Sequence, residues 1–236
     1  EMSYGIPSSP EGHIDGVDLK MKKISQKFKY HADIKFGKYN TLDVEQGHVN
    51  YEHREFENNK SYHAVILSHA INYLKVDISS DISKLGGLYQ SKKFIAGGFY
   101  WTPNTYEDKL AIYASKKGLI FGYDTDYSGR IEHRSIRPRS GETFFSNLDA
   151  NEVRNRQFTL VSGGVSFFKE RESLSNYYQI LFTSRAPSIE DLYSDGPHLG
   201  NYAYEIGDPN LKQENTLGFE NTLSMFNSTS SLNFTS

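Results

Sequence analysis

The sequence predicts an all-β protein, an antiparallel transmembrane β-barrel to which this chain contributes about ten strands. Three observations support this fold class. Aromatic residues make up 14% of the 236 residues, with 17 Tyr and 15 Phe against one Trp, and aromatic rings are enriched in strands. No apolar run approaches the roughly 18 residues of a membrane helix. Several segments also alternate apolar and polar residues over more than the roughly 5 to 6 residues of an average strand.

The clearest alternation runs from Glu214 to Phe226. Its apolar side carries Leu217, Phe219, Leu223 and Met225, interrupted by Asn221. The polar side carries Thr216, Gly218, Glu220, Thr222 and Ser224. A tilted strand needs about 9 to 11 residues to cross a bilayer, and this segment is long enough. It predicts a transmembrane strand with its apolar side toward lipid and its polar side toward an enclosed lumen.

Similar but less regular segments precede it, and most are long, amphipathic and bounded by turns. They are Val17 to Phe36, Leu42 to Phe56, Tyr62 to Ile78, Leu85 to Ile95, Lys109 to Ser115, Leu119 to Glu132, Phe158 to Phe168 and Ser175 to Ser184. In the first of these the apolar positions change from odd to even numbers, which predicts a bulge or turn near Lys22 and Lys23. The segment from Phe158 is apolar on both faces, and its Gly163-Gly164 pair predicts a bend.

The connections between these segments differ in length. Some are as short as "NNK" at 58–60, whereas the stretches from Ile136 to Asn155 and from Arg185 to Gln213 exceed ordinary loop lengths. Outer-membrane barrels have short turns at one end and long loops at the other. We therefore expect the two long stretches to face the outside of the cell.

The second long stretch is rich in turn signals. Pro187 cannot donate to a strand ladder, so the preceding strand is expected to end there. Ser188 and Asp191 have the capping-box spacing, which predicts one helical turn. Gly196-Pro197 then ends that turn, and "GDPN" at 207–210 predicts a type I turn with Pro209 at its second position.

This stretch resembles a segment of the TonB-dependent outer-membrane receptors. The family pattern is R-x-P-x-x-E-L, then G-P-H, then E-x-G-x-P-x-L-x-x-E before a barrel strand. The matching positions are Arg185, Pro187, Glu190 or Asp191, Leu192, Gly196, Pro197, His198, Glu205, Gly207, Pro209, Leu211 and Glu214. Other parts also resemble this family: "YGIP" at 4–7, "EGHIDGVDLKM" at 11–21, "VNYEHREFE" at 49–57 and "GRIEH" at 129–133. The resemblance therefore covers most of the chain.

The resemblance implies a barrel of about 22 strands closed around an amino-terminal plug. Such receptors lie in the outer membrane of Gram-negative bacteria and import scarce nutrients, most often iron chelates, with energy transmitted by TonB. We expect residues 1–236 to form about half of one barrel domain, with the plug, the TonB box and the C-terminal strands absent. The expected partners are a siderophore-like metal chelate, outer-membrane lipid, and TonB acting through the missing plug.

Four arginines, Arg130, Arg134, Arg137 and Arg139, lead into the first long stretch, with His133 among them. Because guanidinium groups bind carboxylates in a fork, these arginines are candidates to attract an anionic metal chelate. The alternatives are a solvated face or contact with lipid phosphates of the outer leaflet. The candidate ligand-binding residues are therefore Arg134, Arg137, Arg139 and His198, although a structural hydrogen bond explains His198 equally well.

No metal site is expected. Asp124, Asp126 and Ser128 match the start of a calcium loop, but the twelfth position is Ser135 instead of Glu and neither flank reads as a helix. A hairpin with Gly129 in its turn is the alternative. The chain has no cysteine, and its 8 histidines show no ligand spacing.

Other function classes find little support in the sequence. The net charge of −3 is spread along the chain, so a nucleic-acid partner is not expected. The sequence also has no G-x-S-x-G, H-E-x-x-H, P-loop or dinucleotide motif, so we expect neither an enzyme nor a bound cofactor. The alternatives to a receptor are a structural or adhesive outer-membrane barrel, or a soluble β-sandwich with a calcium-binding loop.

Overall fold

The computed structural model describes residues 17–57, 61, 63–98, 102–139, 148, 151–198, 203–226 and 230–236. Its main feature is one antiparallel sheet of ten strands, ordered as they follow each other in the chain except that β11 comes after β8. The strands are β1 (Val17–Phe36), β2 (Tyr39–Glu57), β3 (Val65–Ser79), β4 (Ser83–Gly98), β5 (Thr105–Ile120), β6 (Tyr123–Pro138), β7 (Arg156–Arg171), β8 (Leu174–Arg185), β11 (Glu214–Phe226) and β12 (Ser231–Thr235). The predicted all-β antiparallel fold is confirmed.

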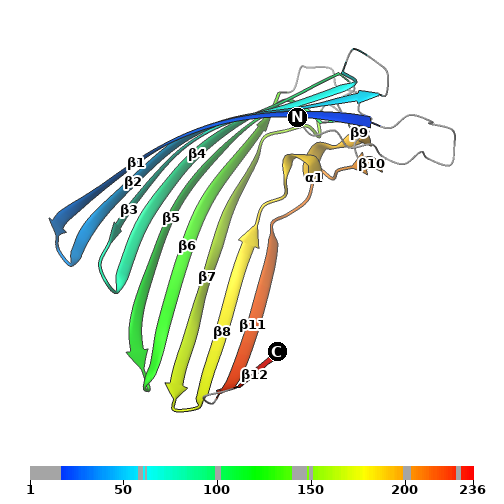
Figure 1. Ribbon diagram of the computed structural model, residues 1–236. Helices are drawn as coiled ribbons and strands as arrows, with labels where there is room; N and C mark the ends of the chain where they lie inside the picture. Colours follow the sequence, from blue (N-terminus) through cyan, green and yellow to red (C-terminus); the bar gives the residue numbers. More distant parts are fainter. Residues whose placement is uncertain are drawn as a thin grey trace.

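Between β8 and β11 the chain forms a helix, α1 (Ile189–Tyr193), and a separate two-stranded hairpin of β9 (Asp195–His198) and β10 (Ala203–Ile206). Both lie at one end of the curved main sheet (Figure 1). Within the described ranges no helix has the length and apolar character needed to cross a membrane.

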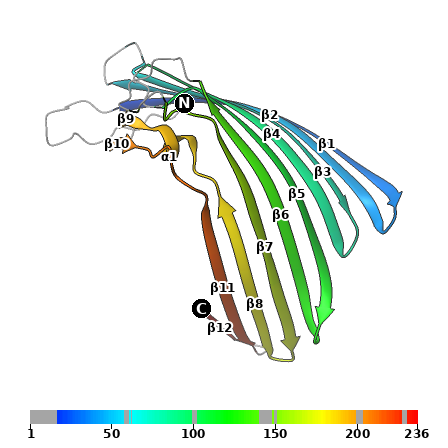
Figure 2. The ribbon, with the colours of Figure 1, turned by 180° about the vertical axis from the view of Figure 1, so that it is seen from behind.

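The two ends of the sheet differ in connection length, as the sequence predicted, but the residues expected to form a short turn, 58–60, belong to the end with the long connections. At one end the strands are joined by connections of two to four residues, at 37–38, 80–82, 121–122, 172–173 and 227–230. At the other end the connections are 58–64, 99–104, 139–155 and 186–213. The view from behind shows the same arrangement, with α1 at the end that carries the long connections (Figure 2).

Strand pairing defines the two faces of the sheet, because directly opposed residues of antiparallel strands point to the same side. One face carries α1, and we call it the concave face; the other is the convex face. A row of polar residues crosses seven strands on the convex face. It consists of Gln26, His48, Asn72, Ser91, Asp108, Ser135 and Gln157. Two residues further toward the short turns, the corresponding row is mixed, with Phe28, Leu74, Tyr89 and Leu110 among its members.

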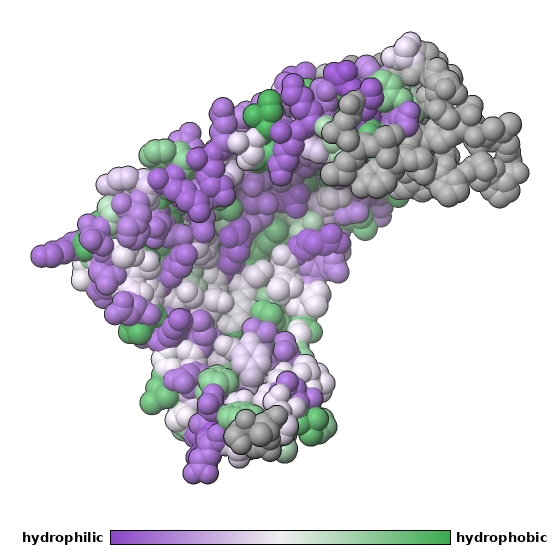
Figure 3. All heavy atoms as spheres, in the orientation of Figure 1, coloured by the Kyte–Doolittle hydropathy of each residue, from purple (hydrophilic) through white to green (hydrophobic). Residues whose placement is uncertain are grey.

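Beyond that mixed row the convex face becomes apolar. The next row contains Tyr30, Val44, Val76, Gly87, Ile112, Ile131 and Val161. We call the apolar region of the convex face on the short-turn side the apolar band. Hydrophobic side chains also reach the surface between hydrophilic ones in the view of Figure 3.

Large apolar side chains are exposed on the convex face, whereas two acidic side chains on the concave face are buried. On the convex face the exposed fractions are 62% for Ile112, 59% for Ile131 and 64% for Phe219. On the concave face the acidic Glu55 and Glu107 are only 0% and 3% exposed. The protein therefore buries charges on one side of its sheet and presents apolar side chains on the other.

Two local predictions are wrong. The strand from Val17 runs without a bulge near Lys22 and Lys23, because its pairing with β2 is continuous to Asp33. The register shift lies instead between Asp33 and Phe36. The apolar residues of β1 change from odd to even positions because the two ends of the strand differ. Near the long connections its apolar residues lie on the concave face and lysines on the convex face, whereas farther along the apolar residues lie on the convex face.

The predicted strand from Leu119 to Glu132 is also wrong, because a tight turn divides it. Phe121 and Gly122 have φ angles of 51° and 75°, which are typical of a two-residue hairpin turn. The Gly163-Gly164 pair, at which the sequence predicted a bend, lies within β7, and the pairing of β7 with β6 and β8 continues through it without a register shift. A side chain at Gly163 would come within 2.9 Å of the Ser128 carbonyl oxygen, so glycine permits close approach of the backbones.

Candidate ligand surface at the mouth of the concave face

The helix α1 is held by the predicted capping box. The Asp191 backbone N–H donates to Ser188 Oγ at 3.0 Å, and the Ser188 N–H donates to an Asp191 carboxylate oxygen at 2.8 Å. These two bonds satisfy donors that a helix start leaves unpaired. The capping residues were identifiable from their spacing because the interaction is local.

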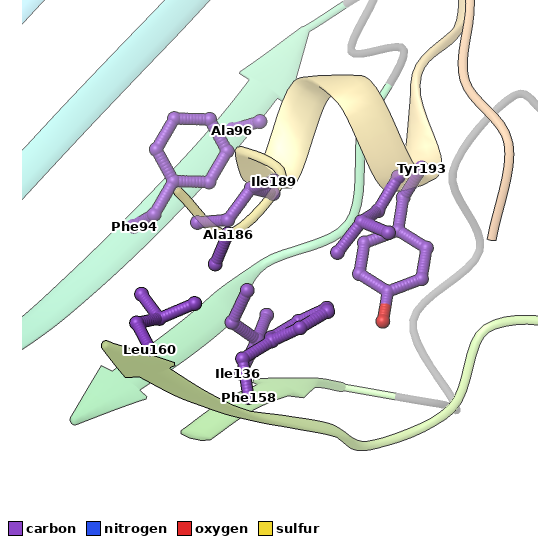
Figure 4. Close-up of a cluster of buried hydrophobic side chains, with 9 residues drawn as sticks. Phe94, Ala96, Ile136, Phe158, Leu160, Ala186, Ile189 and Tyr193 are labelled. Atoms are coloured by element: carbon purple, nitrogen blue, oxygen red, sulfur yellow. The ribbon is translucent and has the colours of Figure 1, made fainter. Parts of the chain in front are cut away.

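One side of α1 packs onto the concave face. Ile189, Leu192 and Tyr193 are almost completely buried, with exposed fractions of 0–1%. They form one apolar cluster with side chains from β4, β6 and β7 and with Ala186 (Figure 4). The strand members are Phe94, Ala96, Ile136, Phe158 and Leu160. This contact explains why the concave positions at the start of β7, Phe158 and Leu160, are apolar.

Hydrogen bonds also hold α1 and the segments next to it. The Tyr193 hydroxyl donates to the Arg154 carbonyl oxygen at 2.6 Å, and burial raises the pKa of Tyr193 to about 12. The Gly207 N–H donates to the Ser194 carbonyl at 2.6 Å. The Leu211 N–H donates to the Asp208 carbonyl at 3.2 Å, which places Pro209 at the second position of the predicted turn. α1 and the segment after it are therefore held in place at the mouth of the concave face.

Next to the cluster around α1, aromatic and imidazole rings share the concave face. His69 lies edge-on to Phe94 at 5.0 Å and to Tyr51 at 5.8 Å between ring centroids. Tyr51 also lies 6.5 Å from His53, whose Nε2 is 3.4 Å from a carboxylate oxygen of the buried Glu55. We call Tyr51, His53, His69 and Phe94 the ring cluster.

Sequence reasoning did not select the ring cluster as a site. Tyr51, His53 and Glu55 occupy alternate positions of β2 and so share a face, which the sequence shows. Their pairing with β3 and β4 depends on register, which the sequence does not show.

Farther toward the short turns, the concave face is lined by paired charges. A Glu45 carboxylate accepts a hydrogen bond from the Tyr73 hydroxyl at 2.8 Å and lies 3.4 Å from Lys29 Nζ. Asp77 accepts from the Tyr113 hydroxyl at 2.5 Å and lies 3.1 Å from Lys84 Nζ. This half of the face is polar and closely charge-balanced.

The predicted arginine cluster is not one site. Arg130 and Arg134 lie on the concave face, whereas Arg137 lies on the convex face because its sequence separation from them is odd. Arg134 Nη2 lies 2.6 Å from Glu107, and the two side chains are only 16% and 3% exposed. Its charge is therefore engaged by a buried partner.

The other predicted ligand residues are separated as well. Arg137 pairs with Asp108 on the convex face. Arg139, past the end of β6, donates to the Tyr106 hydroxyl at 2.7 Å. The backbone of His198 pairs with Ala203 in the β9–β10 hairpin, and its side chain lies outside the described residues.

The calcium-loop interpretation and its hairpin alternative are both wrong. Asp124, Asp126 and Ser128 all lie in β6, where alternate residues are about 7 Å apart and cannot converge on one ion. Gly129 lies within the strand, opposite Ala114 and Gly163. In the part of the chain that the structure describes, no three His, Asp or Glu side chains are grouped to hold a metal ion.

Comparisons with known proteins give no relative: the chain matches no family model and no curated protein.

Proposed function

We propose that the chain is part of the β-barrel of a TonB-dependent outer-membrane receptor that takes up a small metal chelate, a ferric siderophore. The observation that carries the proposal is the difference between the two faces of the sheet. Exposed apolar residues such as Leu217, at 75%, suit lipid, whereas the buried carboxylate of Glu107 suits a polar interior. A soluble sheet of this size would cover its apolar face with a second layer.

The dimensions of the apolar band support a membrane position. On the convex face of β7, polar Thr159 and Lys169 flank Val161, Val165 and Phe167. The two polar residues are ten positions apart, about 33 Å along a strand. At a tilt of about 40° this corresponds to about 25 Å along the membrane normal, the height of the lipid-facing band in outer-membrane barrels.

The edges of the sheet support a larger closed barrel. Among the described residues, β1 and β12 each have one strand neighbour in the sheet. An open edge in hydrocarbon leaves backbone groups unpaired at a cost of several kcal/mol each. Further strands pairing with β1 and β12 would complete the barrel, and the asymmetric connections would place the long loops outside.

Ligand contact is assigned to the ring cluster and the adjoining connections. Arg134 is a poor candidate because Glu107 already engages its charge. Tyr51 and His69 present ring edges and polar atoms on the concave face, near the end that carries the long connections. Pockets for small ligands combine apolar and aromatic walls with a few polar groups, and this surface supplies both.

The test is uptake by the bacterium that encodes the protein. Deleting the gene should abolish uptake of one labelled ferric chelate from a panel of catecholate, hydroxamate and citrate complexes, and plasmid-borne wild type should restore it. Tyr51→Ala and His69→Ala should lower that uptake. Tyr30→Ala, on the convex face and 51% exposed, is the matched control and should not.

If the deletion strain takes up every iron chelate, zinc and cobalamin normally, the protein is not a receptor for them, and the structural or adhesive barrel becomes the better interpretation.

A further inference from the structure

The convex face carries positive charge where the apolar band ends at the short turns. Lys169 and Arg171 occupy the last two convex positions of β7, directly after the apolar Phe167. β6 and β8 flank this end of β7 in the sheet (Figure 1). We call Tyr123 of β6, Lys169 and Arg171 of β7, and Tyr178 of β8 the turn-side rim.

Two tyrosines hold the Lys169 side chain in place. Its ammonium group lies over the Tyr123 ring, 4.8 Å from the ring centroid. The Tyr178 ring packs edge-on against Tyr123, with 6.5 Å between the two centroids. The turn between β5 and β6 approaches the same ammonium group, since a Cβ atom added at Gly122 would lie 3.1 Å from Lys169 Nζ. A cation–π contact orients an ammonium group without removing its charge, so Lys169 is positioned and still attracts an anion.

The two cations of the rim are not compensated by carboxylates. The convex positions of β6, β7, β8 and β11, all of which the structure describes, include no Asp or Glu. The acidic residues of these strands, such as Asp124 and Glu170, lie on the concave face. Glu172 follows Arg171 in the turn between β7 and β8, but within the described part of the chain neither Lys169 nor Arg171 forms an ion pair. This part of the convex face is therefore positively charged.

The rim lies at the depth of lipid headgroups in the proposed membrane position. Lys169 is the residue that ends the lipid-facing band of about 25 Å on β7. Arg171 lies two residues farther, about 7 Å along the strand, which is about 5 Å along the membrane normal at a tilt of about 40°. The headgroup layer on each side of a bilayer is about 5 to 8 Å thick. Both cations therefore lie within this layer, on the side of the short turns.

The two tyrosines add an amphipathic surface to the site. Tyr178 lies directly opposite Phe167, so its ring adjoins the apolar band, and it is 36% exposed. Tyrosine suits the boundary between hydrocarbon and headgroups because its ring is apolar and its hydroxyl is polar. Two cations beside two such rings suit a ligand in which a phosphate is joined to acyl chains. A soluble anion would use only the cations.

We propose that the turn-side rim binds the phosphate of an anionic phospholipid in the leaflet on the side of the short turns. This inference rests on the proposed membrane position, and it concerns the outer surface of the barrel instead of the ligand surface on the concave face. Lys169 and Arg171 bind the phosphate oxygens, while the rings of Tyr123 and Tyr178 contact the glycerol backbone and the upper part of the acyl chains. Because the cations are uncompensated, the site favours phosphatidylglycerol over phosphatidylcholine, whose choline group cancels the phosphate charge.

The test compares phosphatidylglycerol with phosphatidylcholine that has the same acyl chains. Each lipid is titrated onto the full-length protein in dodecyl maltoside micelles, and the bound lipid is counted by native mass spectrometry. The test variant is Lys169→Gln, Arg171→Gln. The matched control is Lys109→Gln, Lys117→Gln, which removes two cations from the concave face of the neighbouring region.

Wild type should prefer phosphatidylglycerol by roughly 25-fold, about fivefold for each cation, as for basic residues at anionic membranes. The test variant should lose most of this preference, and the control should keep it. Tyr123→Leu keeps an apolar surface but removes the ring under Lys169, so the preference should fall by roughly two- to fivefold. Excess glycerol phosphate should compete only weakly, because it lacks acyl chains.

An unchanged preference in the test variant would overturn the proposal, and so would a wild type that binds the two lipids equally. Displacement of phosphatidylglycerol by an equal concentration of glycerol phosphate would also overturn it, because the site would then recognise soluble anions. Bound detergent is measured on the same samples by sedimentation. A wild-type protein without a detergent belt would contradict the membrane position itself, and that result is distinguishable from a belted protein without lipid preference.

Discussion

A lysine at the centre of the apolar band is the most informative single substitution. Ile180 lies on the convex face of β8, four residues from Ser184 on one side and four from Asn176 on the other. Its neighbours across the sheet are Val165 and Phe219. In the proposed membrane position, Ile180 is therefore near the bilayer midplane, whereas in water its side chain would be 46% exposed.

The two environments predict different costs for Ile180→Lys. A lysine on the lipid face near the midplane lowers the free energy of unfolding by about 2–4 kcal/mol. On the surface of a soluble protein, such a substitution stays within about 0.5 kcal/mol. Gln179→Lys is the matched control, because Gln179 faces the concave side opposite Glu220 and should tolerate a positive charge.

The assay is equilibrium unfolding in urea of the full-length protein folded into phosphatidylcholine vesicles, followed by circular dichroism. We expect Ile180→Lys to lose about 2–4 kcal/mol and Gln179→Lys to stay within about 0.5 kcal/mol of wild type. If Ile180→Lys is as stable as Gln179→Lys, the assignment of the convex face to lipid is wrong.

Three further substitutions test the packing of the concave face. Leu192→Ala leaves a cavity under α1, which should lower the free energy of unfolding by about 3 kcal/mol. It should also speed the hydrogen exchange of backbone amides at 189–195. Unchanged exchange would show that α1 is not anchored by this contact. Glu107→Gln should lower the free energy of unfolding in vesicles by about 3 kcal/mol, because Arg134 then keeps an unpaired buried charge. The double variant Glu107→Gln, Arg134→Met should recover most of this loss. If the single and the double variant are equally unstable, the pairing of Glu107 with Arg134 is contradicted. Gly86→Ala should lower the free energy of unfolding by about 1–3 kcal/mol, because the added methyl group overlaps the ring of Tyr113. A methyl group at Gly87 has room, so Gly87→Ala should be nearly neutral. Similar losses for the two variants would refute the close contact at Gly86.

Local chemistry was the part of the fold that the sequence predicted well. The alternation of Leu217 and Phe219 with polar neighbours was sufficient to identify β11 and its two faces. Ser188 and Asp191 identified α1 because a capping box needs only residues three positions apart. Both predictions depend on neighbours in the chain, so no knowledge of strand pairing was needed.

Strand boundaries and contacts between residues far apart in the chain were harder to predict from the sequence. Phe121 adopts a left-handed conformation that a bulky residue rarely takes, so the turn before Gly122 was read as strand. The sequence does not reveal the partner of Arg134, because Glu107 is 27 residues away and only the register of β5 with β6 brings the two side chains together. The ring cluster was missed for the same reason, because it spans β2, β3 and β4.

The central claim, that the apolar side of the sheet faces lipid and the polar side an aqueous lumen, can be measured directly by spin labelling along β11. The chain has no cysteine, so single labels can be placed at Thr216, Leu217, Phe219 and Glu220 of the vesicle-embedded protein without removing native thiols. Labels at 217 and 219 should relax with membrane-dissolved oxygen, and labels at 216 and 220 with a water-soluble nickel complex. Collision of the nickel complex with 217 and 219, or protection of these two positions from both reagents, would contradict the account.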